Sequence, residues 1–263
     1  MELHLTGKVA IVTGASKGIG LAVTRALVAE GVQVVAGARN DSSELAGLAA
    51  QTSGGVHPVL VDLGTPEGPQ HLVDEAVRAF GGVDVLVNNV GALKPRLDGF
   101  LAITDEDWAW ALNINFMAAV RTTRAALPHL LERAPSTVVT INSVNAALPD
   151  PGVLDYSAAK AALVNFSKSL SKEFGPRGVR INTVSPGPVE TGLWLGENGV
   201  AATRAGADGN AADVVKEAAS QSVTGRFTHP DEVADLVLLL ASGRAGNVTG
   251  SDVVIDGGLI GTI

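Results

Sequence analysis

The chain has 263 residues, of which 46% are hydrophobic and 17% charged, a balance typical of a compact globular protein rather than a disordered one. It contains no cysteine, which excludes disulfides and thiolate metal sites, and its five histidines show no metal-ligand spacing, so we expect no metal. A net charge of -8, without a run of Lys or Arg, argues against nucleic acids and anionic membranes as partners. Without a signal-like N-terminus or a long apolar stretch, we expect a cytoplasmic protein.

Short runs rich in Val and Ile alternate with longer helical patterns almost to the end of the chain. Apolar strands that alternate with helices are typical of βαβ units, in which a parallel sheet is covered on both faces. The sequence therefore predicts an α/β fold, a doubly wound, Rossmann-like sheet of about seven strands in a single domain, residues 1–263. The expected strands are Val9–Val12, Val32–Ala36, Val56–Val61, Val83–Val87, Thr137–Ile141, Arg180–Val184 and Asp252–Ile255. The expected helices are 19–30, 43–51, 66–80, 104–133, 155–174 and 230–241.

Two features interrupt this rhythm. Pro128 lies inside the expected helix 104–133, and because proline lacks an N–H we expect it to bend or end the helix. Residues 191–222 are rich in Gly and Ala with weak periodicity, and we interpret them as a substrate lid with a short helix near Asp213–Ala219. A disordered insertion is the alternative interpretation of this segment.

The segment TGASKGIG, residues 13–20, has two possible interpretations. Gly14 to Gly18 satisfies the G-x-S-x-G pattern of a hydrolase, which would make Ser16 a nucleophile. That fold requires an oxyanion loop after an earlier strand, whereas this segment follows the first expected strand. A glycine turn between a strand and a helix that begins near Ile19 instead favours a cradle in which backbone N–H groups hold a pyrophosphate. A P-loop is excluded because no Gly-Lys-Ser/Thr follows the turn.

Four motifs occur in order along the chain: TGASKGIG, NNVG at 88–91, YSAAK at 156–160 and SPGPVET at 185–191. Together they resemble the short-chain dehydrogenase/reductase family over about residues 8–258, outside the lid. The resemblance implies a nicotinamide dinucleotide cofactor, a ketone or secondary alcohol as substrate and a homotetramer, built partly from the helices at 104–133 and 155–174. By the same resemblance, Ser16 contacts a phosphate or ribose and is not a nucleophile.

The end of the second strand predicts which cofactor binds. Ala38 stands where members of the family that prefer NAD carry an acid, and Arg39 follows it. A guanidinium without a neighbouring carboxylate suits a 2′-phosphate, and Lys17 can add a second positive charge, so we predict NADP(H) rather than NAD(H). The alternative is that Arg39 lies on the surface and Asp41 is the ribose-binding acid, although Asp41 is better placed, with Ser42 and Ser43, to cap the next helix.

Tyr156 and Lys160 lie four residues apart on an expected helix, so they share one face. An ammonium about 4 Å from the phenol would lower its pKa by up to about three units at an effective dielectric of about 20, toward the range that acid–base catalysis needs. The alternative is an ordinary helix with an exposed Lys and a buried Tyr. Ser143, at the end of the preceding strand, favours the catalytic interpretation.

The family resemblance also implies individual roles. Tyr156 exchanges a proton with the substrate oxygen, Ser143 hydrogen-bonds that oxygen, and Lys160 lowers the pKa of Tyr156 and holds the nicotinamide ribose. Asn115 supports a water relay to Lys160, and Asn113 is the neighbouring alternative. Asp62 resembles the adenine contact, with loop capping as the other interpretation. The expected cofactor-binding residues are Gly14, Ser16, Lys17, Gly18, Ile19, Gly20, Arg39, Asp62, Asn88, Gly91, Tyr156, Lys160, Pro186, Gly187, Val189 and Thr191.

The substrate end of the site is less defined by sequence. Trp194, Leu193 and Leu195 in the lid, with Leu93, Val144 and Leu148 near strand ends, suggest a partly apolar pocket. A 3-oxoacyl thioester, a steroid-like ketone, a sugar and an aromatic ketone all fit such a pocket. A cofactor-binding sensor or scaffold without catalytic activity is the alternative function.

Overall fold

Seven parallel strands form one sheet, in the order β3-β2-β1-β4-β5-β6-β7. The structure is a computed structural model, and it describes residues 2–261. The predicted doubly wound α/β fold is confirmed, and each expected strand is present within a few residues of its predicted bounds. The strands are β1 Val9–Thr13, β2 Gln33–Ala38, β3 Val56–Leu60, β4 Val85–Asn88, β5 Ser136–Ile141, β6 Val179–Pro186 and β7 Asp252–Ile255.

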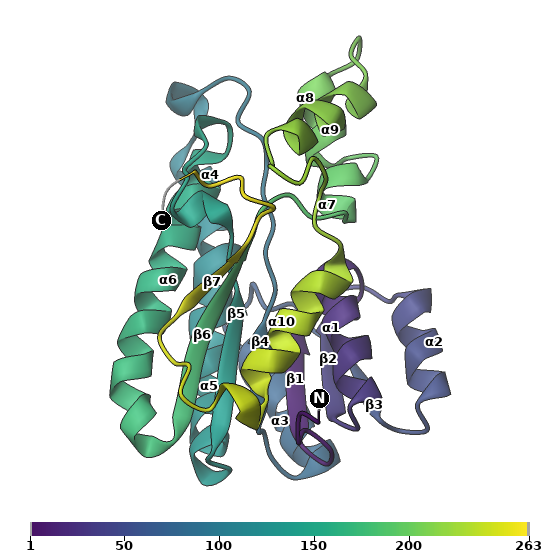
Figure 1. Cartoon of the computed structure of the whole chain (residues 1–263), viewed down its shortest axis with the longest axis vertical. Coiled ribbons are helices and arrows are strands. Elements are labelled where there is room, and N and C mark those ends of the chain that lie inside the picture. Colours follow the sequence, from purple (N-terminus) through teal and green to yellow (C-terminus); the bar gives the residue numbers. More distant parts are fainter. Residues whose placement is uncertain (1, 262–263) are drawn as a thin grey trace.

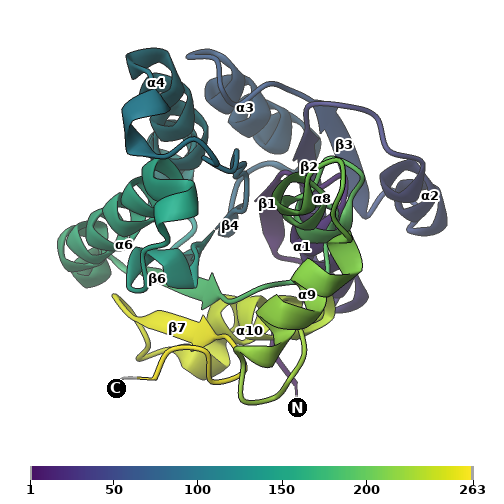
Figure 2. The same ribbon diagram turned by 90° about the horizontal axis from the view of Figure 1, so that it is seen from above.

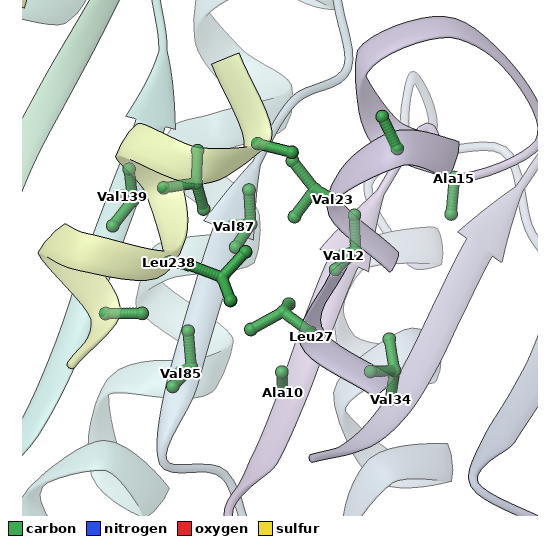
Figure 3. Packing of buried hydrophobic residues seen from close by; sticks show 14 of the residues in the cluster. Ala10, Val12, Ala15, Val23, Leu27, Val34, Val85, Val87, Val139 and Leu238 are labelled. Atoms are coloured by element: carbon green, nitrogen blue, oxygen red, sulfur yellow. The ribbon is translucent and has the colours of Figure 1, made fainter. Parts of the chain in front are cut away.

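Apolar side chains cover both faces of the sheet, as the uniformly apolar strands predict. Ala10 and Val12 of β1 point toward one face, where they pack with Leu27 and Leu238, whereas Ile11 points toward the other, where it packs with Leu72. Figure 3 shows the first of these two clusters, between the sheet and two helices. Burial on both faces explains why strand residues alternate in direction without alternating in polarity.

The helices lie on the two faces of the sheet, in the arrangement that Figures 1 and 2 show. The expected helix 104–133 is not one continuous α-helix, because a π-helical turn, Asn113–Met117 (η2), separates α4 from α5. Pro128 does not end the helix, since it lies inside α5, which continues to Glu132. The main helices are α1 Gly18–Ala29, α2 Ser43–Gln51, α3 Gly68–Phe80, α4 Asp105–Leu112, α5 Ala118–Glu132, α6 Leu154–Phe174 and α10 Pro230–Ala241.

The segment interpreted as a lid contains three short helices, α7 Gly192–Leu195, α8 Val200–Ala205 and α9 Ala211–Ser220. They lie together at one end of the molecule, beyond the carboxyl end of β6 (Figure 1). The chain on either side of the segment is joined by a parallel bridge between Val189 and Thr228. No helix among residues 2–261 has both the length and the hydropathy to cross a bilayer.

Candidate active site

A cleft of about 840 Å³ lies at the carboxyl ends of the strands. It includes the ends of both β1 and β4, which are neighbours in the sheet although they are not consecutive in the chain. From β1 the chain adds strands first on one side of the sheet and then, from β4, on the other. Open α/β sheets bind ligands in the crevice at such a switch point. The cleft is lined by most of the expected site residues and by residues of the segment 191–222, which we call the lid segment.

The glycine turn lines the cleft where α1 begins. Gly14 and Gly18 have positive φ angles of 67° and 55°, which other residues rarely adopt. Lys17 is the N-cap residue of α1, and its side chain makes no capping hydrogen bond, so the first N–H groups of the helix are available to an anion. A phosphate fits this uncapped, glycine-lined helix start. No histidine hydrogen-bonds Ser16 within residues 2–261, so the hydrolase interpretation gains no support.

One predicted glycine lies outside the cleft. Gly20 is buried behind the turn, where an added Cβ would come within 2.2 Å of the carbonyl oxygen of Gly14. Its missing side chain therefore permits close packing of α1 against β1 and does not line the ligand space.

The cations expected at a 2′-phosphate border the cleft. Lys17 and Arg39 both line it and are exposed, and neither forms an ion pair within residues 2–261. Asp41, the alternative ribose-binding acid, does not line the cleft, and it is Ser42 that caps α2 by accepting the N–H of Leu45. The end of β2 thus presents positive charge to the cleft.

Asp62, the expected adenine contact, lines the cleft, and its Oδ1 accepts the N–H of Gly64 at 2.8 Å. Asp62 therefore caps its own loop and also lines the cleft, so the two interpretations do not exclude each other. Asn88 does not line the cleft: it is buried, and its Nδ2 donates to Thr123 at 2.9 Å. Its neighbour Asn89 takes that place, because successive residues at the end of β4 point to opposite sides.

Asn115, and not Asn113, lies beside Lys160. Asn115 is completely buried in the π-helical turn, and its carboxamide bonds both the N–H (2.9 Å) and the carbonyl oxygen (2.7 Å) of Ala92. A Cβ added at Gly91 would lie 3.2 Å from Asn115 Oδ1 and 3.5 Å from Lys160 Nζ, so the three residues adjoin. Asn113 points elsewhere, donating to Gly64 and accepting from Arg121.

Ser143, Tyr156 and Lys160 meet at the wall of the cleft below the lid segment. Ser143 follows β5, whereas Tyr156 and Lys160 project from the first two turns of α6, and all three are buried but line the cleft. The ammonium of Lys160 lies 5.5 Å from the centre of the Tyr156 ring and donates to the carbonyl of Ile141 at 3.0 Å.

Burial controls the ionisation of this pair. It raises the pKa of Tyr156 to about 12, and the nearby Ser143 hydroxyl offsets this rise only in part. Burial also lowers the pKa of Lys160 to about 8. The expected fall in the pKa of Tyr156 is thus wrong, because burial removes the phenolate from water and raises the pKa instead.

A buried ion pair that the sequence analysis missed stands next to Tyr156. Asp155 is 1% exposed, and its Oδ1 accepts the N–H of Tyr156 at 2.9 Å. Arg96 donates to the other oxygen of Asp155 and also bonds Asp107, at the start of α4, at 2.9 Å. Arg96 therefore joins the loop after β4 to the helix that carries Tyr156. No sequence motif marks it.

The side of the cleft next to the lid segment is more polar than expected. Leu193, Trp194, Leu93, Val144 and Leu148 line it as predicted, but Leu195 does not. The polar residues that line this part are Asn145, Asp150, Arg204, Glu217 and Gln221. Arg204 of α8 forms a 2.5 Å ion pair with Asp150, which connects the lid segment to the loop before α6. The remaining predicted residues Ile19, Pro186, Gly187, Val189 and Thr191 also line the cleft.

Comparisons with known proteins agree with this geometry. A family model described as enoyl-(acyl carrier protein) reductase matches residues 14–260. The chain is 31% identical to a 3-oxoacyl-(acyl-carrier-protein) reductase of Thermotoga maritima, over 98% of this chain and 100% of the relative. It is 32% identical to dehydrogenase/reductase SDR family member 4 of Pongo abelii, over 97% and 88% of the two chains. The solved L-sorbose reductase of Gluconobacter frateurii, complexed with NADPH and L-sorbose, superimposes with a TM-score of 0.91 at 32% identity over 100% of both chains.

Proposed function

The chain belongs to the short-chain dehydrogenase/reductase family, as an oxidoreductase that uses a nicotinamide cofactor, and we propose that it reduces ketones with NADPH. One observation carries this proposal: Ser143, Tyr156 and Lys160 are buried together in the cleft that begins at the uncapped start of α1. A bound reduced nicotinamide supplies the hydride. The reverse reaction, oxidation of a secondary alcohol, uses the same groups.

We assign the proton transfer to Tyr156. Because its pKa is raised to about 12, the phenol is protonated at neutral pH and can donate to a carbonyl oxygen as that oxygen gains charge. Ser143 stabilises the same oxygen by a second hydrogen bond. Lys160, with a pKa of about 8, is mostly an ammonium at neutral pH and can hold the hydroxyls of the nicotinamide ribose, while Asn115 fixes the neighbouring loop.

The preference for NADPH rests on Arg39 and Lys17, the exposed cations of the cleft that have no carboxylate partner among residues 2–261. The relative solved with NADPH supports it. Replacing Arg39 by Ala removes a charge-assisted contact of about 1.5–3 kcal/mol, so kcat/KM with NADPH should fall at least tenfold while that with NADH changes little. Equal use of both cofactors by the unmutated enzyme would refute the preference.

A panel of ketones, followed by the absorbance of NADPH, tests the activity itself. Turnover should disappear in Tyr156→Phe, whereas fluorescence titration should show that NADPH still binds. Binding of NADPH without turnover of any ketone would instead support a sensor or scaffold. Including 3-oxoacyl thioesters tests the activity for which the Thermotoga maritima relative is named.

We also propose that the protein is a homotetramer in the cytoplasm, with contacts built partly from α4, α5 and α6. Apolar side chains at the edge of this region remain exposed in the single chain: Leu101 is 96% exposed and Leu112 is 36% exposed. Such residues lose contact with water when copies associate. A scattering mass that corresponds to a monomer would refute the tetramer.

A further inference from the structure

The hydroxyl of Ser143 already has a partner inside the protein. Its Oγ donates to Oδ1 of Asn145 at 3.0 Å and accepts the N–H of the same residue at 3.2 Å. Both side chains line the cleft. A serine hydroxyl carries one proton, so Ser143 cannot donate to Asn145 and to a substrate oxygen at the same time.

Donation to a substrate carbonyl therefore takes the proton away from Asn145. Within residues 2–261, Asn145 Oδ1 has no other donor, and Asn145 Nδ2 makes no hydrogen bond. The carboxamide would be left facing the substrate with its acceptor unpaired, which is unfavourable where water is excluded. A substrate that returns a donor to Asn145 Oδ1 avoids this loss.

A hydroxyl on the carbon next to the carbonyl provides that donor. Ser143 Oγ and Asn145 Oδ1 lie 3.0 Å apart, a separation that two oxygens on adjacent carbons can match. We propose that Asn145 selects α-hydroxy ketones: the carbonyl oxygen accepts from Ser143 and Tyr156, and the neighbouring hydroxyl donates to Asn145. This rests on the proposed ketone reductase function. The carbonyl carbon gains a hydride and its oxygen gains the proton of Tyr156, so the product is a vicinal diol.

The surroundings of Asn145 agree with a hydroxylated substrate. Asp150, Arg204 and Gln221 line the same part of the cleft, where they can hydrogen-bond further hydroxyls. Within residues 2–261 the Gln221 side chain has no hydrogen-bond partner, so a plain hydrocarbon chain would desolvate it without compensation. A 3-oxoacyl thioester has no hydroxyl next to its ketone and leaves Asn145 Oδ1 unpaired. The polar lining thus favours the hydroxylated substrate.

The test compares 1-hydroxybutan-2-one with butan-2-one, which differ by one hydroxyl, at saturating NADPH. The measured quantity is the ratio of the kcat/KM values of the two ketones. The ketones differ in intrinsic reactivity, but this difference cancels when the ratio is compared between variants. We expect Asn145→Ala to lower this ratio at least tenfold, about 1.4 kcal/mol. Leu148→Ala, which changes an apolar residue of the same cleft, is the matched control and should keep the wild-type ratio.

A second variant tests the acceptor directly. Asn145→Asp keeps an acceptor oxygen and loses the N–H donors, so it should retain most of the preference. An unchanged ratio in Asn145→Ala, or loss of the preference in Asn145→Asp, would overturn the assignment to Asn145 Oδ1. Turnover of both ketones with no difference between the variants refutes only this selectivity, whereas no turnover of any ketone by the wild-type enzyme refutes the reductase function and the inference with it.

Discussion

Replacing Lys160 by Met should stabilise the ligand-free protein while it abolishes turnover. Lys160 is 3% exposed, has no carboxylate partner within residues 2–261, and donates one hydrogen bond, to the carbonyl of Ile141. Its pKa falls from 10.5 to about 8 because burial disfavours the ammonium. At about 1.36 kcal/mol per pH unit, holding the charged form in the folded state at pH 7 costs about 3 kcal/mol.

Methionine has a similar shape and removes this cost, although the hydrogen bond to Ile141, worth about 1 kcal/mol, is lost. We therefore expect Lys160→Met to raise the free energy of unfolding by about 2 kcal/mol at pH 7, and the melting temperature by about 4–8 °C. The matched control is Lys168→Met on the same helix, since Lys168 also donates to a backbone carbonyl, that of Gly250, but is exposed. That change should alter stability by about 0.5 kcal/mol or less.

The pH dependence separates charge from packing. Between pH 8 and 10.5 the unfolded chain binds a proton at Lys160 that the folded chain has lost, so wild-type stability rises with pH in this window. The advantage of Lys160→Met should fall to about zero near pH 9.5, as urea unfolding of the ligand-free proteins would measure. A variant that is less stable than wild type at pH 7, or an advantage that is the same at both pH values, would refute the role given to burial.

Three further predictions concern neighbouring groups. Tyr156 keeps its proton to about pH 12 when folded but to about 10 when unfolded, so wild-type stability should fall as pH rises through this window and Tyr156→Phe should lack that fall in urea unfolding. Arg96→Leu leaves Asp155 buried without its partner, so the free energy of unfolding should fall by about 3 kcal/mol and kcat should also fall. Adding Asp155→Asn should partly restore both quantities. An unchanged kcat would show that Arg96 does not position Tyr156. Gly20→Ala places a Cβ 2.2 Å from a backbone oxygen and should abolish NADPH binding. The control Gly47→Ala meets no atom within 4 Å and should stabilise α2 by about 0.5–1 kcal/mol. Equal effects of the two substitutions in thermal unfolding would contradict this packing.

The sequence predicted the fold because its strongest signals are local. Buried parallel strands must be apolar on both faces, so the composition of runs such as Val9–Val12 is enough to predict a strand. Pro128 removes one backbone N–H donor, but α5 continues past it to Glu132, so the proline does not end the helix. The π-helical turn at 113–117 carries no comparable signal, since it depends on the contacts of Asn113 and Asn115 with loops far away in the chain.

The candidate site was predictable where family motifs occur and not elsewhere. Asn88 was assigned to the cofactor in place of Asn89 because sequence does not reveal which of two adjacent asparagines faces the cleft at a strand end. Asn145 and Arg204 belong to loops and to the lid segment, whose positions follow from tertiary contacts. Arg96 is 59 residues from its partner Asp155, a pairing that no short-range pattern contains.

The ionisation of Tyr156 was mispredicted for a different reason. Charge attraction alone, with a lysine one helical turn away, lowers the pKa of the phenol, but both groups are buried and each is driven toward its neutral form. The ammonium is also directed to the carbonyl of Ile141. With a pKa of about 12, Tyr156 keeps its proton at neutral pH and can donate it to a developing alkoxide, although it is a weaker acid than a free phenol. Oxidation requires added positive charge in the cleft or alkaline conditions, and the same residues then run the reaction in reverse.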